Sequence, residues 1–322
     1  MRKKLLWGFM YTVIFALSTV FGSVVITDFT TGDGGLSKIK WDHSVGTIQK
    51  DFSYGDKQSN KFDLYLPANR SKKNYGLVVY THGGGFTGGD KADDSDILKW
   101  IASKGYVGAG VNYTLIDKDS NHLITIYEIT EEIKKAIPIV IQQANKSGYS
   151  INKMATGGGS AGSLLAMVYA YRDSKNSSIP LVFTFQASGP TLTEPKNFGI
   201  TTDIASYKGI KEQLNFFNGF LGVDVTEQEI KNKNYKEKIK SVSPTLLINK
   251  HSAPILFAHG KEDRIVPYQQ AESLLNVLNN NNISYDFIEF KKSGHRLNWQ
   301  PKKMTEFINK LSDYLNKYMP IN

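Results

Sequence analysis

The chain contains no cysteine, so it forms no disulfide, no cysteine-based metal site and no lipid attachment through an amino-terminal cysteine. It also lacks an arginine-rich stripe with interleaved aromatic residues, which would be typical of a nucleic-acid-binding surface. The net charge of +9 comes instead from lysines scattered through polar segments, often beside asparagine. We therefore expect no nucleic-acid partner, and at most a mild preference for anionic surfaces or polymers.

The amino terminus differs from the rest of the chain. Basic residues at positions 2–4 precede a charge-free run at residues 5–21, which is typical of an export signal. The run is close to the short limit for crossing a bilayer, so an uncleaved membrane anchor is the alternative. Gly22 allows cleavage before Ser23, and a buried amino-terminal helix is the non-export interpretation. We expect residues 1–22 to be a signal peptide or anchor and the protein to be secreted, periplasmic or membrane-anchored.

No internal repeat and no long linker rich in proline, glycine or serine divides the rest of the chain. With 322 residues, 40% of them hydrophobic and 21% charged, the composition suits one large α/β domain over residues 23–322.

Alternation of short apolar runs with helical patterns predicts the architecture. Residues 47–54 and 62–66 alternate apolar and polar side chains, as half-buried antiparallel strands do. Residues 77–81 form an apolar run that suits a buried central strand. Strands that alternate with helices predict a mostly parallel sheet between two helical layers. Further strands are expected at 107–113, 154–158, 181–186, 254–258 and 285–290, and helices at 93–104, 124–145, 160–171, 269–279 and 304–318.

Two features interrupt this pattern. Pro138 lies inside the helix expected at 124–145, where it predicts a kink or a break. The long interval between Ser188 and His251 is polar, basic and locally aromatic. An interval of this length between two core strands is typical of a functional insertion, and we expect a helical cap over the active site at about residues 190–250.

The segment Gly158-Gly159-Ser160-Ala161-Gly162 follows an expected strand and precedes an apolar helix. A sharp strand-to-helix turn with small neighbours projects one side chain into a cleft, so Ser160 is the candidate nucleophile. The alternative is a glycine-rich turn with a solvent-facing serine. A phosphate-binding loop is not indicated, because the Gly-x4-Gly-Lys-Ser/Thr spacing is missing.

A second glycine-rich segment, His82-Gly83-Gly84-Gly85-Phe86, follows the expected strand at 77–81. Acyl transfer builds negative charge on a carbonyl oxygen, and fixed backbone N–H groups must point at it. Glycines let the backbone present these groups without interference from a Cβ atom. The amides of Gly83 and Gly84, with that of Ala161, are the expected oxyanion donors, and His82 is expected to brace the loop.

A serine nucleophile needs a base, and the base needs an acid that fixes its tautomer. His295, in Ser-Gly-His-Arg, follows an expected strand and precedes the last helix. His259 ends another strand and is expected to brace a loop. Asp263 follows that strand, and Glu262 is the adjacent alternative acid.

Taken together, HGGG, GGSAG, HGKED-x-x-VP and SGH make the chain resemble the α/β-hydrolase superfamily over about residues 45–320. Within it the chain resembles the hormone-sensitive-lipase-like carboxylesterases and the acetyl-xylan and feruloyl esterases. The order of the triad in that superfamily is serine, acid, histidine, which selects Asp263 and His295 and leaves out His82. The resemblance implies an eight-stranded, mostly parallel sheet, no metal and no cofactor.

The resemblance also implies that residues 86–91 shape the acyl side of the pocket, where Phe86 would contact the substrate. One departure bears on the substrate. The hormone-sensitive-lipase-like branch usually carries an acidic residue before the nucleophile, and this chain has Gly159. That difference favours the polysaccharide-esterase-like branch.

These observations predict a serine carboxylesterase that removes short, acetyl-type acyl groups from polar alcohols or carbohydrates. The expected partner is a small-molecule or polysaccharide ester, with possible membrane anchorage through the amino terminus. Three alternatives remain: a lipase for longer acyl chains, an amidase, formamidase or peptidase with the same triad, and a non-catalytic binding protein on this fold.

Overall fold

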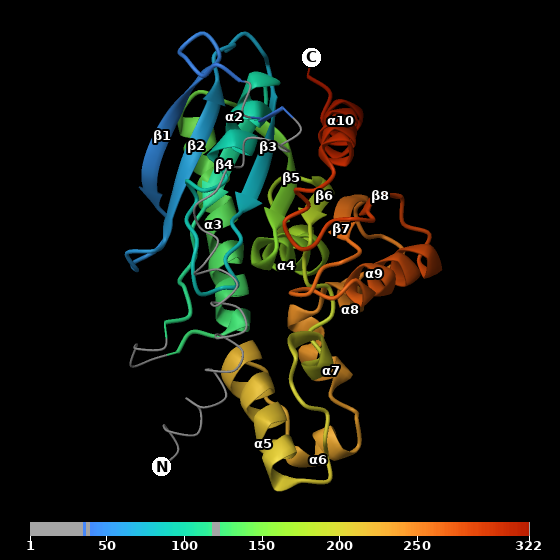
Figure 1. Ribbon diagram of the computed structural model, residues 1–322. Helices are drawn as coiled ribbons and strands as arrows, with labels where there is room; N and C mark the ends of the chain where they lie inside the picture. Colours follow the sequence, from blue (N-terminus) through green and yellow to red (C-terminus); the bar gives the residue numbers. More distant parts are fainter. Residues whose placement is uncertain (1–34, 37–38, 118–122, 322) are drawn as a thin grey trace.

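An eight-stranded sheet in the order β1-β2-β4-β3-β5-β6-β7-β8 forms the centre of the protein in the computed structural model (Figure 1). The structure describes residues 35–36, 39–117 and 123–321. The strands are β1 (Gly46–Ser53), β2 (Lys61–Pro67), β3 (Tyr75–Thr81), β4 (Val107–Val111), β5 (Ile151–Gly159), β6 (Leu181–Ala187), β7 (Ile255–Gly260) and β8 (Tyr285–Phe290). The α-helices are α2 (Ser95–Ser103), α3 (Ile126–Lys146), α4 (Ala161–Val168), α5 (Tyr207–Leu214), α6 (Glu227–Lys231), α7 (Lys236–Ile239), α8 (Pro244–Leu247), α9 (Gln269–Asn280) and α10 (Pro301–Tyr318).

The sheet is mostly parallel, as the sequence predicts. Only β1 with β2 and β2 with β4 pair antiparallel, and the strands from β4 across to β8 pair parallel. Parallel neighbours need crossover connections, which the intervening helices supply. The carboxyl ends of the parallel strands therefore gather at one edge of the sheet, where the loops that carry chemistry follow.

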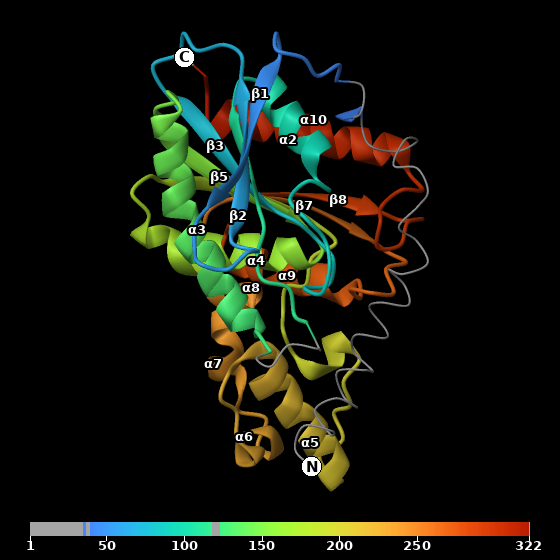
Figure 2. The same ribbon diagram turned by 90° about the vertical axis from the view of Figure 1, so that its left-hand side faces the viewer.

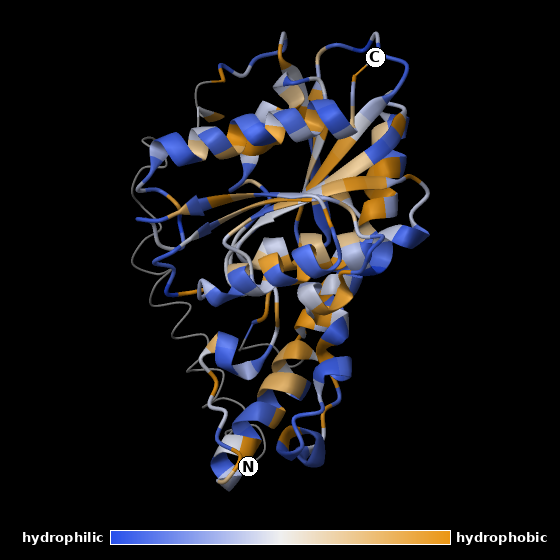
Figure 3. Ribbon diagram, turned by 90° about the vertical axis from the view of Figure 1, so that its right-hand side faces the viewer, coloured by the Kyte–Doolittle hydropathy of each residue, from blue (hydrophilic) through white to orange (hydrophobic). Residues whose placement is uncertain are grey.

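Helices cover both faces of the sheet (Figure 2). The core on one face joins α3 and α4 to the strands, and α9 packs beside α4 on the same face. The core on the opposite face contains α2 and α10. Figure 3 shows the central strands as mainly hydrophobic, whereas the helices carry hydrophobic and hydrophilic residues in alternation. The arrangement is the predicted helix–sheet–helix sandwich.

Three local expectations need correction. The α-helix α3 continues past Pro138 to Lys146. Proline lacks a backbone N–H group and so removes one helical hydrogen bond, but the buried isoleucine and valine side chains on both sides of it keep the helix on the sheet. Strand β5 begins at Ile151 and is longer than expected, because its first residues pair with β3. The helix after Ser160 changes at Tyr169 into a π-helix, η3 (Tyr169–Asp173).

The interval between β6 and β7 is folded into short helices, α5 to α8, together with the π-helix η6 (Asn215–Leu221). Thr226 and Glu229 form a capping box at the start of α6. The ring of Phe217 in η6 packs against Tyr235 at a tilt of 44°, with ring centroids 4.7 Å apart. Figure 1 shows α5 and α6 projecting from the sheet, at the bottom of the view. The cap function of these helices stays a prediction.

The predicted signal or anchor, residues 1–22, lies outside the described residues, so export stays a prediction. Within the part of the chain that the structure describes, no helix has the length and apolar character needed to span a bilayer.

A nearly buried lysine ties the loop after β3 to the edge of the sheet. The Lys91 Nζ atom lies 2.9 Å from Asp51 Oδ1 and 3.3 Å from Asp63 Oδ1, and its side chain is 8% exposed. Asp63 Oδ1 also accepts the Asp51 N–H, at 2.8 Å. The Lys91 N–H donates to Asn112 Oδ1 at 2.6 Å, which fixes the loop to the end of β4. The loop is therefore attached at two points.

We expect Lys91→Met to lower the free energy of unfolding by about 3–5 kcal/mol, because it leaves the buried Asp63 carboxylate without its cation. Lys99→Met is the matched control, since Lys99 makes only a surface pair with Asp96 at 3.3 Å. That control should change stability by less than about 1 kcal/mol. Urea unfolding of the three proteins measures both values, and equal losses in the two variants would contradict the expectation.

Candidate active site

Ser160 lies in a strained turn between β5 and α4. Its φ is 52° and its ψ is −119°, a conformation that non-glycine residues rarely adopt. Such strain persists only where the surrounding structure fixes the backbone, and it is concentrated at functional sites. The Ser160 N–H donates to Ala187 O of β6 at 2.8 Å, which holds the turn at the carboxyl edge of the sheet.

Close backbone approach explains the glycines around this serine. A Cβ atom on Gly162 would lie 2.0 Å from the Thr81 carbonyl oxygen, at the end of β3. A Cβ atom on Gly158 would lie 2.4 Å from the carbonyl carbon of Gly162. The Thr81 hydroxyl donates to Gly162 O at 2.7 Å, which also holds the end of β3 against the turn. Only glycine fits at these two positions.

The three residues predicted as a triad form one hydrogen-bonded chain. His295 Nε2 lies 2.8 Å from Ser160 Oγ, and His295 Nδ1 lies 2.8 Å from Asp263 Oδ2. A carboxylate accepts from Nδ1–H, which leaves Nε2 free to accept the serine proton. Ser160 follows β5, His295 follows β8 and Asp263 follows β7. Parallel pairing of these strands therefore brings the three residues to one edge of the sheet.

The Asp263 carboxylate is fully buried and held by the backbone of its own loop. Its Oδ1 atom accepts the N–H groups of Ile265 at 2.8 Å and Val266 at 2.9 Å. These charge-assisted bonds fix the carboxylate and satisfy the lone pairs that His295 does not use. Glu262, the alternative acid, is exposed to solvent. The structure therefore places Asp263, and not Glu262, against His295.

Of the predicted oxyanion donors, Gly83 and Ala161 lie next to the serine. A Cβ atom on Gly83 would lie 3.5 Å from Ser160 Cβ, so the Gly83 backbone passes directly beside the serine. Gly84 has a φ of 108°, and its carbonyl oxygen accepts the N–H groups of Thr87 and Gly88 at 3.1 and 3.0 Å. Ala161 begins α4, where the first N–H groups have no partner within the helix.

His82 supports the glycine loop through a ring contact and hydrogen bonds. Its ring stacks on Tyr113 with centroids 4.3 Å apart, and Nδ1 lies 2.7 Å from Gly83 O. The Tyr113 hydroxyl donates to His82 O at 3.0 Å. Burial lowers the pKa of His82, so its imidazole is neutral at pH 7. The sequence did not indicate that Tyr113 supports the glycine loop, because this residue reaches the loop only through the pairing of β3 with β4.

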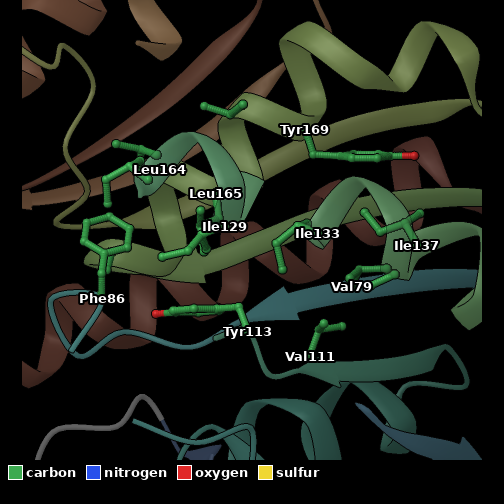
Figure 4. Close-up of a cluster of buried hydrophobic side chains, with 14 of the residues drawn as sticks. Val79, Phe86, Val111, Tyr113, Ile129, Ile133, Ile137, Leu164, Leu165 and Tyr169 are labelled. Carbon is green, nitrogen blue, oxygen red and sulfur yellow. The ribbon is translucent and has the colours of Figure 1, made fainter. Parts of the chain in front are cut away.

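Phe86 is 3% exposed and has a φ of 66°. Its ring packs edge-on against Phe220 of η6, with centroids 6.4 Å apart. Figure 4 shows it beside Leu164 of α4 in the hydrophobic core. Its backbone oxygen accepts the Ile116 N–H at 2.8 Å. The structure thus brings the interval between β6 and β7 against the glycine loop, and a direct contact of Phe86 with substrate stays a prediction.

No group of three or more histidine, aspartate or glutamate side chains is arranged to hold a metal ion within the described ranges. The chemistry of the site is that of a buried carboxylate, an imidazole and a serine hydroxyl at the mouth of a glycine loop.

The sheet order and the strained strand-to-helix turn define a protein of the α/β-hydrolase fold. The BD-FAE family model, which describes an esterase domain of this fold, matches residues 62–278. The chain belongs to the BD-FAE family.

Known relatives and structures are similar to this chain at low identity. Esterase LipC of Mycobacterium tuberculosis is 21% identical over 258 residues, which cover 75% of this chain and 58% of the relative. Kynurenine formamidase of Danio rerio is 28% identical, over 40% of this chain and 41% of the relative. A truncated carbohydrate esterase from gut microbiota superposes with a TM-score of 0.63 at 19% identity, covering 85% of this chain and 99% of that one. This chain spans about half the length of the curated relatives it matches.

We expect Gly162→Ala to prevent stable folding or to lower the melting temperature severely, because the new methyl group overlaps the Thr81 carbonyl oxygen. Gly88→Ala is the matched control in the glycine loop, since its Cβ atom would meet only Gly84 O, at 3.9 Å. The control should melt close to the wild type. Circular dichroism melts of both variants provide the comparison, and a wild-type melt for Gly162→Ala would rule out the close contact.

Proposed function

We propose that this protein is a serine carboxylesterase in which Ser160 is the nucleophile, His295 the base and Asp263 the orienting acid. One observation carries the proposal: the unbroken chain of hydrogen bonds from Ser160 Oγ through both nitrogens of His295 to the buried Asp263 carboxylate. Hydroxyl, imidazole and carboxylate in this order activate a serine toward acyl transfer.

The reaction follows from the geometry. His295 Nε2 takes the proton as Ser160 Oγ attacks the ester carbonyl carbon. The negative charge that develops on the carbonyl oxygen is stabilised by the backbone amides of Gly83, Gly84 and Ala161. The C–O bond of the ester breaks, and the alcohol leaves with the proton from His295. Water then attacks the acyl-enzyme by the same steps, releasing the acid and restoring the serine.

The names of similar proteins support an ester substrate, since LipC and the gut carbohydrate esterase are both called esterases. Amide hydrolysis is the second candidate, and the similarity to a kynurenine formamidase favours it. The same serine, histidine and oxyanion loop can attack either carbonyl group. A panel of nitrophenyl esters beside matched nitroanilides separates the two when each rate is divided by that of the uncatalysed hydrolysis, and we expect the larger acceleration for the esters.

Ser160→Ala, His295→Ala and Asp263→Asn should each lower kcat by at least about a thousandfold with the fold intact. Glu262→Gln is the matched control, because its side chain is exposed and should leave kcat unchanged. Ester turnover gives the rates, and a fluorophosphonate probe reports directly on the reactivity of Ser160. A wild-type protein that neither labels nor turns over would instead support a non-catalytic binding protein.

We further propose a short acyl group, acetyl above all, on a carbohydrate or another polar alcohol. Phe86 and Phe220 crowd the side of the glycine loop, which supports a short acyl pocket. Trp299 follows His295 by four residues and is 76% exposed, and we propose that its ring stacks on the sugar of the substrate. The similarity to a carbohydrate esterase supports the same substrate class.

Across a nitrophenyl-ester series, kcat/KM should be highest at about two to four acyl carbons. Contacts with each methylene contribute only about 1–3 kcal/mol, so exclusion by the crowded pocket must provide most of the selectivity. Acetylated oligosaccharides in the same assay test the alcohol. A maximum at eight carbons or longer, or activation on emulsified triglyceride, would favour the lipase alternative.

A further inference from the structure

A second histidine lies against the triad carboxylate. His259, at the end of β7, has a fully buried side chain whose Nε2 atom lies 3.5 Å from Asp263 Oδ2. His295 Nδ1 approaches the same oxygen at 2.8 Å. The carboxylate of Asp263 is therefore flanked by two imidazoles, of which only His295 reaches Ser160.

The tautomer of His259 follows from its partner. Nε2 lies 2.9 Å from the Val266 carbonyl oxygen, which can only accept, so Nε2 carries the hydrogen. This N–H is directed at Val266 O and lies within reach of the charge on Asp263. The other nitrogen, Nδ1, is buried with no hydrogen-bond partner among the described residues.

A proton on His259 would place an unpaired N–H and a charge in this enclosed position, which is costly. Burial accordingly lowers the pKa of His259, and His295 lowers it further, while the hydrogen bond to Val266 and the charge of Asp263 oppose the shift only in part. Tyr268 also packs against the ring, with centroids 6.1 Å apart, and its hydroxyl donates to Glu289. His259 thus stays neutral, and the charge of Asp263 remains available to His295.

The same hydrogen bond fixes the turn that holds Asp263. Val266 donates its N–H to Asp263 Oδ1 and accepts the N–H of His259 through its carbonyl oxygen. His259 therefore joins the rigid end of β7 to the loop whose amides orient the carboxylate. Building on the proposed function, we propose that His259 is a positioning residue that fixes Asp263 for His295 through its Nε2–H group.

The test separates the N–H group from the ring. His259→Gln keeps an N–H donor near the Nε2 position but removes the ring, whereas His259→Phe keeps the ring and removes the donor. Tyr268→Phe is the control, because it removes a neighbouring hydroxyl that does not contact Asp263. For each protein we would measure kcat and KM, the pH dependence of kcat/KM, the rate of fluorophosphonate labelling at Ser160, and the melting temperature.

We expect His259→Phe to lower kcat about 10- to 100-fold with little change in KM, as small displacements of catalytic groups do. The pH at which kcat/KM falls to half should rise, because Asp263 without the His259 N–H stabilises protonated His295 more strongly. His259→Gln should keep kcat within a few-fold of the wild type and keep the wild-type pH profile.

Two results would overturn the inference while the proposed function stands: an active His259→Phe with a wild-type profile, or a His259→Gln as impaired as a His259→Phe of equal melting temperature. If His259→Phe is less stable than the wild type, kcat and the pH profile of both variants are compared at a temperature at which both are folded. Failure of the wild-type protein to label at Ser160 or to hydrolyse any ester would overturn the proposed function and this inference with it.

Discussion

The contact between the end of β3 and the turn after β5 is the constraint on which the site depends. Gly162 approaches the Thr81 carbonyl so closely that no side chain fits between them, and this approach holds Ser160 at a positive φ. The same end of β3 continues into the glycine loop, so one contact sets the serine beside Gly83. Neither strand could shift without separating the hydroxyl from the backbone that would bind the oxyanion.

Burial determines how the charges around the site are distributed. The Asp263 carboxylate is removed from water but receives backbone N–H groups on one oxygen and a histidine on the other. Partners of this kind make a buried carboxylate tolerable, and the low dielectric strengthens each bond. His82 and His259 are enclosed, and burial lowers the pKa of both, although His259 Nε2 lies 3.5 Å from Asp263 Oδ2. Through contacts with backbone carbonyl oxygens, His82 stabilises the glycine loop and His259 stabilises the loop that carries Asp263.

Much of the fold follows from local patterns, and the errors have local causes. The strands and the parallel order follow from short apolar runs between helical patterns, which reflect burial on both faces of the sheet. Of the kink or break expected at Pro138, the break was wrong, because packing of α3 on the sheet outweighs one lost hydrogen bond, and the kink stays a prediction. The π-helix after Val168 has no counterpart in the periodicity of the sequence, and its Arg172 pairs with Glu131 of α3 at 2.7 Å.

The sequence by itself determined which residues had to be glycine and which residue types could carry the chemistry, because turn strain and motif order are properties of the local chain. It did not determine which polar groups would meet. Glu262 and Asp263 are neighbours in sequence, yet only Asp263 is buried against His295. The approach of His259 to Asp263, of Tyr113 to His82 and of Phe220 to Phe86 depended on the sheet and its insertion coming together. These contacts join residues on different strands and loops, whose distances are fixed only when the core packs.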